Sequence, residues 1–163
     1  MAGGGVNRRP LEIVINGRRL RTDVEPHVTL LRFLRDRVGA TEVKYGCGEG
    51  VCGACTVLLD GKAVNSCSVL AMQAEGTTVE TVAGLGRDGE LHPLQRALVE
   101  RGAVQCGFCT PGVVLAALEA VRLDLAGDRA QLRRSLAGNL CRCTGYRTIV
   151  EAVEAYRDEE AAS

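Results

Sequence analysis

The chain has 163 residues, of which 46% are hydrophobic and 25% are charged, a composition typical of a globular protein and not of a disordered one. Its 20 Lys and Arg residues balance its 20 Asp and Glu residues, which argues against electrostatic binding to nucleic acid or to an anionic membrane. Only 3% of the residues are aromatic, so the core must be built from aliphatic side chains, and small domains of that kind usually need additional cross-links.

The first half of the chain predicts a small sheet crossed by one helix. Asn16-Gly17 and Asp60-Gly61 each separate two short apolar runs, and these dipeptides favour β-hairpins because both positions accept positive φ. Between the hairpins, apolar residues recur at helical spacing, with Thr29 as a possible N-cap and Gly39 as a possible stop. The predicted elements are a hairpin over 11–24, a helix over 29–38, a hairpin over 56–64 and a strand over 77–82. This set indicates a β-grasp domain of the plant-ferredoxin type.

The second half of the chain predicts helices. Pro93 and Thr110-Pro111 are well placed to start two of them. Asp128 with Gln131 resembles a capping box for a third helix, and Thr148 with Glu151 resembles one for a fourth. We therefore expect a C-terminal four-helix bundle.

Together these elements predict an α+β protein with two domains. The predicted divisions are a flexible N-terminus at 1–10, a ferredoxin-like domain at 11–83, a linker at 84–91, a helical domain at 92–158 and a tail at 159–163. No segment has the apolar length of a membrane span or the continuous apolar run of an export signal. We expect a cytoplasmic protein without direct membrane insertion, periplasmic only if a partner carries an export signal.

The first of two groups of four cysteines comprises Cys47, Cys52, Cys55 and Cys67. Its C-x4-C-x2-C spacing, with a fourth cysteine after eleven further residues, is that of a plant-type [2Fe-2S] site. Four glycines between positions 46 and 53 suit a loop that wraps closely around a cluster. A structural zinc site is the main alternative, but zinc knuckles usually pair two short C-x2-4-C units.

The second group comprises Cys106, Cys109, Cys141 and Cys143. It consists of a C-x2-C pair, 31 intervening residues and a C-x-C pair. The first pair directly precedes a predicted helix start, whose positive end and unpaired N–H groups favour negative charge. A thioredoxin-like redox pair is disfavoured because no βαβ pattern surrounds it. Eight sulfurs divided four and four satisfy two clusters, which indicates electron transfer.

Three segments resemble the signatures of a known family. KYGCGEGVCGACTV (44–57), VQCGFCTPGVV (104–114) and GNLCRCTGYR (138–147) resemble those of the iron-sulfur component of the xanthine dehydrogenase and aldehyde oxidoreductase family, the molybdenum hydroxylases. The resemblance covers about 11–156. It implies a ferredoxin-like domain and a four-helix domain, each with one [2Fe-2S] cluster.

The resemblance also implies cofactors and partners. Electrons would pass one at a time from molybdopterin, in its dinucleotide form, on a large subunit, through both clusters to FAD on a medium subunit or to another acceptor. Gln105 and Cys143 would lie beside the pterin as hydrogen-bonding neighbours. Substrate oxidation would take place on the partner, so we expect no catalytic residue in this chain.

Two other functions compete with this interpretation. One is a free-standing two-cluster ferredoxin-like carrier, which the zero net charge disfavours because such carriers usually dock through charge. The other is a non-redox module with two structural metal sites. The only two histidines, His27 and His92, lie in no pattern of base and nucleophile and are expected at the surface or at a helix start.

Overall fold

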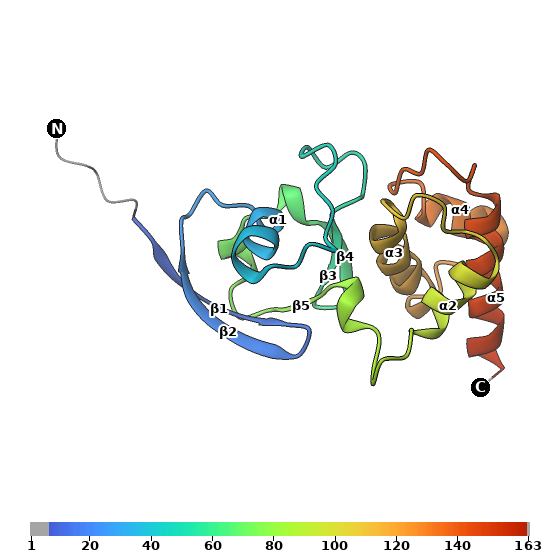
Figure 1. Ribbon diagram of the computed structural model, residues 1–163, viewed down its shortest axis with the longest axis horizontal. Helices are drawn as coiled ribbons and strands as arrows, with labels where there is room; N and C mark the ends of the chain where they lie inside the picture. Colours follow the sequence, from blue (N-terminus) through green and yellow to red (C-terminus); the bar gives the residue numbers. More distant parts are fainter. Residues whose placement is uncertain (1–6, 163) are drawn as a thin grey trace.

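The computed structural model describes residues 7–162 and divides into a sheet with one short helix and a group of four helices (Figure 1). This arrangement confirms the predicted α+β class. Of the predicted flexible N-terminus, residues 1–6 lie outside the described residues, whereas Arg9 and Pro10 already belong to the first strand. The last helix continues to Ala161, beyond the predicted domain end at 158. The divisions at 83, 84 and 91 remain predictions.

The sheet has five strands in the order β2-β1-β5-β3-β4. The strands are β1 (Arg9–Ile15), β2 (Arg18–Val24), β3 (Thr56–Leu59), β4 (Lys62–Asn65) and β5 (Thr78–Glu80). Strands β1 and β5 run parallel, and the other neighbouring pairs are antiparallel. Both hairpins are confirmed, with positive φ at Asn16 (48°), Gly17 (78°), Asp60 (47°) and Gly61 (79°). The β-grasp prediction therefore holds.

The helix expected over 29–38 is present, but it changes type along its length. Helix α1 (Leu30–Arg32) begins at Thr29, whose side chain accepts a hydrogen bond from the Arg32 N–H, and the chain continues as a π-helix over Phe33–Val38. Gly39 ends it with φ of 81°. An apolar period read from the sequence does not separate i→i−4 from i→i−5 hydrogen bonding, so the π turn was not predicted.

The four C-terminal helices are α2 (Pro93–Glu100), α3 (Thr110–Arg122), α4 (Arg129–Ser135) and α5 (Arg147–Ala161). His92 caps α2, since its Nδ1 accepts a hydrogen bond from the Leu94 N–H, and the Asp128 capping box on α4 is confirmed. The predicted cap at Thr148 is wrong. Helix α5 follows Tyr146, which has φ of 67°, so Thr148 lies inside the helix and its buried Oγ1 has no hydrogen-bond partner among residues 7–162.

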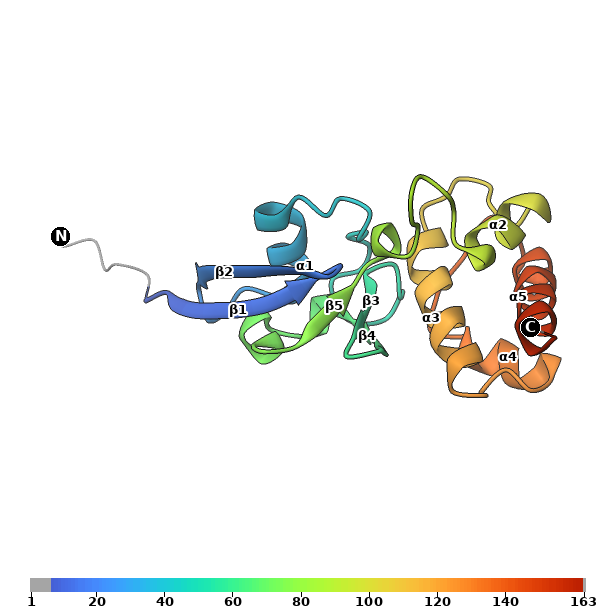
Figure 2. The same ribbon diagram turned by 90° about the horizontal axis from the view of Figure 1, so that it is seen from below.

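Helix α3 joins the two halves. It lies between the sheet and the other helices, as the view from below shows (Figure 2). Leu58 of β3 belongs to the apolar core of the helical half, where it packs with residues such as Leu115 and Leu118. The Glu119 carboxylate accepts a hydrogen bond of 2.9 Å from the Ala63 N–H of β4. The two halves therefore share buried surface.

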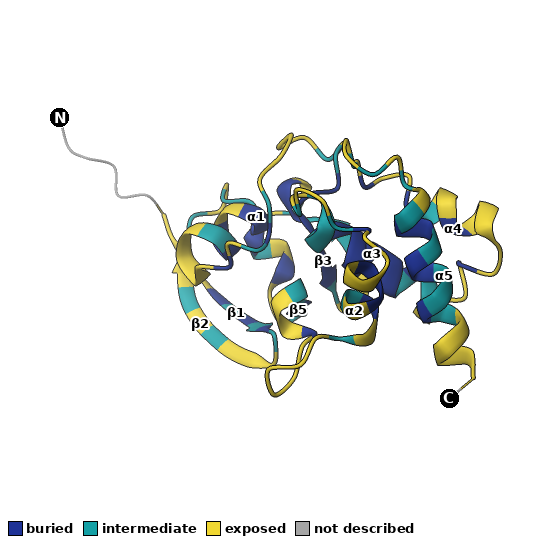
Figure 3. Cartoon of the chain, turned by 45° about the vertical axis from the view of Figure 1, so that its right-hand side comes forward, coloured by how far each residue is buried: buried dark blue, intermediate teal, exposed yellow. Residues whose placement is uncertain are grey.

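Strand β2 and the C-terminal end of α5 are largely exposed (Figure 3). None of the helices in the described part of the chain has both the length and the apolar content that crossing a bilayer requires.

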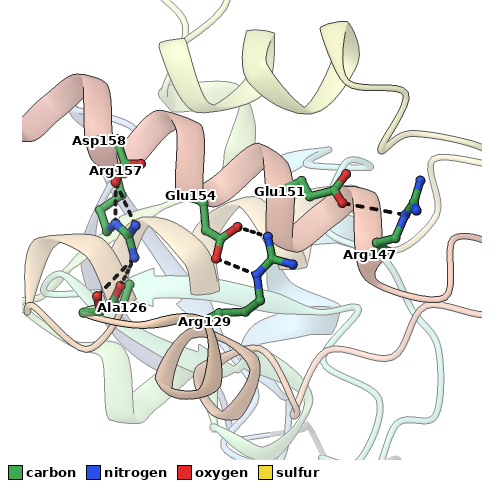
Figure 4. Close-up of polar contacts among 8 residues, drawn as sticks. Ala126, Arg129, Arg147, Glu151, Glu154, Arg157 and Asp158 are labelled. Atoms are coloured by element: carbon green, nitrogen blue, oxygen red, sulfur yellow. Dashed lines mark hydrogen bonds and ion pairs between the residues drawn. The ribbon is translucent and has the colours of Figure 1, made fainter.

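An ion pair between Arg129 and Glu154 ties α4 to α5 (Figure 4). The Arg129 hydrogen bond lowers the pKa of Glu154 below its ordinary value of 4.5. Stabilisation from a lowered carboxyl pKa is present above that value and is lost as the pH falls through the folded pKa. We expect Glu154→Gln to lower the free energy of unfolding at neutral pH by at most about 1 kcal/mol. The difference from the parent should shrink as the pH falls below 4.5 and vanish once the pH is below the lowered pKa of Glu154 in the folded protein.

Thermal unfolding, followed by circular dichroism at several pH values with iron content checked at each, measures this effect. Glu151→Gln is the control, because Glu151 pairs with the highly exposed Arg147 at 3.7 Å across one turn of α5. An equal loss of unfolding free energy in both variants would contradict the larger contribution expected from the Arg129–Glu154 ion pair.

Candidate metal centres

Seven of the eight cysteines lie outside helices and strands, and Cys67 lies in a single 3-10 turn over Ser66–Ser68. The loop before β3 and the loop before α5 both rise along the upper edge of the molecule in Figure 1. None of the eight cysteines, all of which lie in the described part of the chain, forms a disulfide. All eight sulfurs are therefore available to a metal.

The loop of the first group directs backbone N–H groups at its sulfurs. The N–H groups of Glu49, Val51 and Cys52 point to Cys47 Sγ at 3.5, 3.4 and 3.4 Å. The Gly50 N–H points to Cys67 Sγ at 3.2 Å, and the positive φ of Gly50 (78°) turns the chain for it. Donors arranged in this way favour a negatively charged sulfur.

The thiols of the first group differ in their affinity for protons. Hydrogen bonds from the N–H groups of Glu49, Cys52 and Val51 lower the pKa of Cys47 to about 6. Burial raises the pKa of Cys55 to about 11. The side chain of Cys47 interacts with that of Cys52, and that of Cys55 with that of Cys67. The group thus consists of a buried pair and a pair in which Cys47 is exposed and Cys52 is half-buried.

The second group is also arranged as two pairs. Cys106 Sγ lies 3.5 Å from Cys143 Sγ, and the side chain of Cys109 interacts with that of Cys141. Burial raises the pKa of Cys109, the N-cap residue of α3, to about 12. Burial also acts on Cys141, but hydrogen bonds from Thr144, whose Oγ1 lies 3.2 Å from the sulfur, help to lower its pKa overall. The fold brings together cysteines that the sequence separates by 31 residues.

The donor set and its pairing fit two-iron clusters. Within residues 7–162, no group of three or more His, Cys, Asp or Glu side chains is placed to hold one metal ion. A two-iron cluster does not need such a group, because each of its irons takes two protein ligands. Thiolate donors are those that iron-sulfur clusters require. The eight cysteines therefore fit the two [2Fe-2S] clusters predicted from their spacing.

The two residues expected beside a pterin lie together at the surface. Gln105 is exposed and directly precedes Cys106, which is itself exposed and paired with Cys143. Cys143 is exposed as well. Both residues thus lie at the exposed side of the second group.

Residues that the sequence analysis did not select connect the two groups. The buried Asn139 side chain donates hydrogen bonds to the Gly53 carbonyl at 2.9 Å and to Thr56 Oγ1 at 3.1 Å. The Leu140 N–H donates to the Cys52 carbonyl at 2.9 Å. The Tyr146 hydroxyl accepts from the Cys141 N–H at 2.8 Å and donates to the Asn139 carbonyl at 3.2 Å. Their only signal in the sequence is their position beside the second pair of cysteines.

Comparison with known proteins identifies the family. Residues 13–83 match the family model of the 2Fe-2S iron-sulfur cluster binding domain, and residues 81–154 match that of the [2Fe-2S] binding domain. The chain is 47% identical over 148 residues to the 6-hydroxypseudooxynicotine dehydrogenase complex subunit beta of Paenarthrobacter nicotinovorans, covering 90% of this chain and 92% of the relative. It is 46% identical over 145 residues to the xanthine dehydrogenase iron-sulfur-binding subunit of Escherichia coli O157:H7, covering 88% and 91%.

The solved structures give the same result. A chain of quinoline 2-oxidoreductase from Pseudomonas putida 86 superposes with a TM-score of 0.90 at 43% identity, covering 95% of this chain and 96% of that chain. Both domains and their order are therefore shared with that chain, as the resemblance of the signature segments implied. The protein belongs to the [2Fe-2S]-binding iron-sulfur subunits of the xanthine dehydrogenase family of molybdenum hydroxylases.

Proposed function

We propose that the cysteines of this electron-transfer subunit hold two [2Fe-2S] clusters, Cys47, Cys52, Cys55 and Cys67 the first and Cys106, Cys109, Cys141 and Cys143 the second. Electrons would pass one at a time from a molybdopterin site on a large subunit, through the second site and then the first, to an FAD-binding medium subunit or another acceptor. The observation that carries the proposal is that the eight disulfide-free cysteines form four pairs, two within each group of four defined by the sequence.

The protein's part in this function is to hold the sulfurs and to set their electrostatic surroundings. A bound [2Fe-2S] cluster supplies a centre that takes up and releases a single electron. The N–H groups aimed at Cys47 and Cys67 stabilise added negative charge and so favour the reduced state of the first site. At the second site the N-terminus of α3, next to Cys109, acts in the same direction.

The exposure of residues at the two cysteine groups supports the proposed order of electron transfer. Gln105 and Cys143 lie at the exposed side of the second group, where a pterin on a partner subunit can reach them. Cys47 is exposed in the first group, which suits transfer to an acceptor. Three apolar side chains next to the cysteines are also exposed: Val51 by 60%, Phe108 by 47% and Leu140 by 53%. Exposed apolar groups around a redox site favour a lasting subunit contact over a brief electrostatic encounter.

The substrate of the complex is set by the partner in this proposal. Relatives of this chain are subunits of a caffeine dehydrogenase, a nicotine 6-hydroxylase and a xanthine dehydrogenase. Small subunits that are so alike serve complexes named for different substrates, so the substrate-binding residues lie elsewhere. A reducing compartment such as the cytoplasm suits eight cysteines kept as thiols.

The purified full-length chain provides the first test. We expect visible absorption that bleaches with dithionite, about four irons per chain, and two distinct [2Fe-2S] signals in electron paramagnetic resonance (EPR). A colourless protein that carries zinc would overturn the proposal. The partners are tested by purifying the chain from its native host and identifying bound subunits and cofactors by mass spectrometry. Recovery of the chain alone, with both clusters, would instead support the free-standing carrier.

A further inference from the structure

The two cysteine loops contact each other at Gly53, between Cys52 and Cys55. The Gly53 carbonyl accepts hydrogen bonds from the Asn139 side chain at 2.9 Å and from the Thr56 hydroxyl at 2.7 Å. A Cβ on Gly112, in the first turn of α3, would lie 2.3 Å from the same carbonyl oxygen. The loop of the first group, the loop of the second group and the start of α3 are therefore packed around one peptide group.

One backbone hydrogen bond across this contact links a proposed ligand of the first site to the residue that precedes a proposed ligand of the second site. The Leu140 N–H donates to the Cys52 carbonyl at 2.9 Å. Leu140 directly precedes Cys141. The sulfur of Cys52 is thus connected to the sulfur of Cys141 through covalent bonds of three residues and one hydrogen bond. Electron tunnelling weakens less through bonds than through open space, so this is a short route between the groups.

Asn139 holds that hydrogen bond in place. Asn139 is 6% exposed, and its two Nδ2 hydrogens are used by Gly53 O in the first loop and by Thr56 Oγ1 at the start of β3. Its carbonyl accepts from the Tyr146 hydroxyl, which also binds the Cys141 N–H. Asn139 is therefore fixed to both loops, and Leu140 follows it directly in the chain. Because these hydrogen bonds fix Asn139, they also fix the position of the adjacent Leu140 N–H relative to the Cys52 carbonyl.

We propose that Asn139 is a positioning residue for electron transfer between the two sites, and that the Cys52 carbonyl and the Leu140 N–H form the bridge. The proposal rests on the cluster ligands proposed above. In each step one electron leaves the second site, which is oxidised, and enters the first site, which is reduced. No covalent bond breaks and no proton is transferred. The partner subunits supply and remove the electron.

The test uses the full-length chain with both clusters, reduced by dithionite. Asn139→Ala removes both donors, and Asn139→Asp keeps the shape of the side chain while removing them. The magnetic interaction between the two reduced clusters, seen as splitting of their EPR signals at low temperature, falls steeply with their separation. We expect both variants to retain two cluster signals of normal intensity but to show a smaller splitting than the parent. Electron exchange between the sites after photoreduction should slow by up to about a hundredfold, as positioned reactions do when their groups shift by about 1 Å.

The control is Glu119→Ala, which removes another hydrogen bond between the halves, from the Ala63 N–H, without touching either cysteine loop. It should weaken the contact between the halves yet leave the splitting and the exchange rate unchanged. Unchanged splitting in both Asn139 variants would overturn the proposal, as would equal loss in Glu119→Ala. Absence of clusters from the parent protein would overturn the proposed function itself, so the two failures are distinguishable.

Discussion

Replacing Cys47 with serine is expected to abolish the first EPR signal and about half of the bound iron. Cys47 Sγ receives three backbone N–H groups and is paired with Cys52, so its loss removes both a ligand and the acceptor around which the loop is folded. A serine hydroxyl is a poor substitute, because iron-sulfur clusters select thiolates. The second signal should persist, since Cys106 and Cys109 are held at the start of α3.

Cys106→Ser is the reciprocal variant and should remove only the second signal. Iron analysis and EPR of the dithionite-reduced chain measure both effects. Loss of both signals in Cys47→Ser would show that the second site depends on the first through the Leu140 and Asn139 contacts. Helix content from circular dichroism then tells whether the helical half has unfolded as well.

Replacing Gly53 with alanine is expected to destabilise the protein far more than the same change at Gly61. Both glycines have positive φ, 67° and 79°, so both substitutions carry backbone strain of about 1–2 kcal/mol. At Gly53 the new Cβ would also lie 2.3 Å from the Gly138 carbonyl oxygen, whereas at Gly61 nothing lies within 4 Å. Forcing an atom into a packed contact adds about 1–3 kcal/mol. The total loss at Gly53 is then about 2–5 kcal/mol.

Thermal unfolding of the cluster-loaded chain, followed by circular dichroism, measures the difference between the two variants. Gly61→Ala isolates the strain, because the turn between β3 and β4 is open to solvent on that side. We also expect Gly53→Ala to reduce the magnetic splitting between the clusters, since its Cβ pushes against the loop that carries Asn139. Equal destabilisation at the two positions would mean that the loops move apart freely and that their contact has little energetic weight.

The contact between the two cysteine loops at Gly53 explains how the two domains can be held in one arrangement. In the proposed function the subunit passes electrons between two partners, which requires a constant separation between its two sites. The buried Asn139 amide, the hydrogen bond from the Leu140 N–H to the Cys52 carbonyl and the close approach of Gly53 and Gly112 would hold the two sites at a fixed separation. The exposed residues of each site remain free to face a partner.

Much of the fold was predictable because its signals are local. Asn16-Gly17 and Asp60-Gly61 specify hairpins through their own backbone preferences, and Asp128 with Gln131 specifies a helix start within one turn. The cysteine spacing indicated two groups, because the chemistry of cluster binding constrains which residues can be ligands. Those features depend on neighbours in the chain and so can be read from it. The start of α5 could not, because it follows Tyr146, whose positive φ and hydrogen bonds to Asn139 and Cys141 correspond to no capping pattern in the sequence.

The amino-acid sequence by itself determined the two cysteine groups, the hairpins, most of the helix starts and the family. Only the tertiary structure decided which cysteines pair, which of them are exposed, and that Asn139 reaches Gly53 across 86 positions of sequence. The reason is physical: a buried amide acquires its partners when distant segments pack, and no local preference of an Asn-Leu dipeptide encodes them.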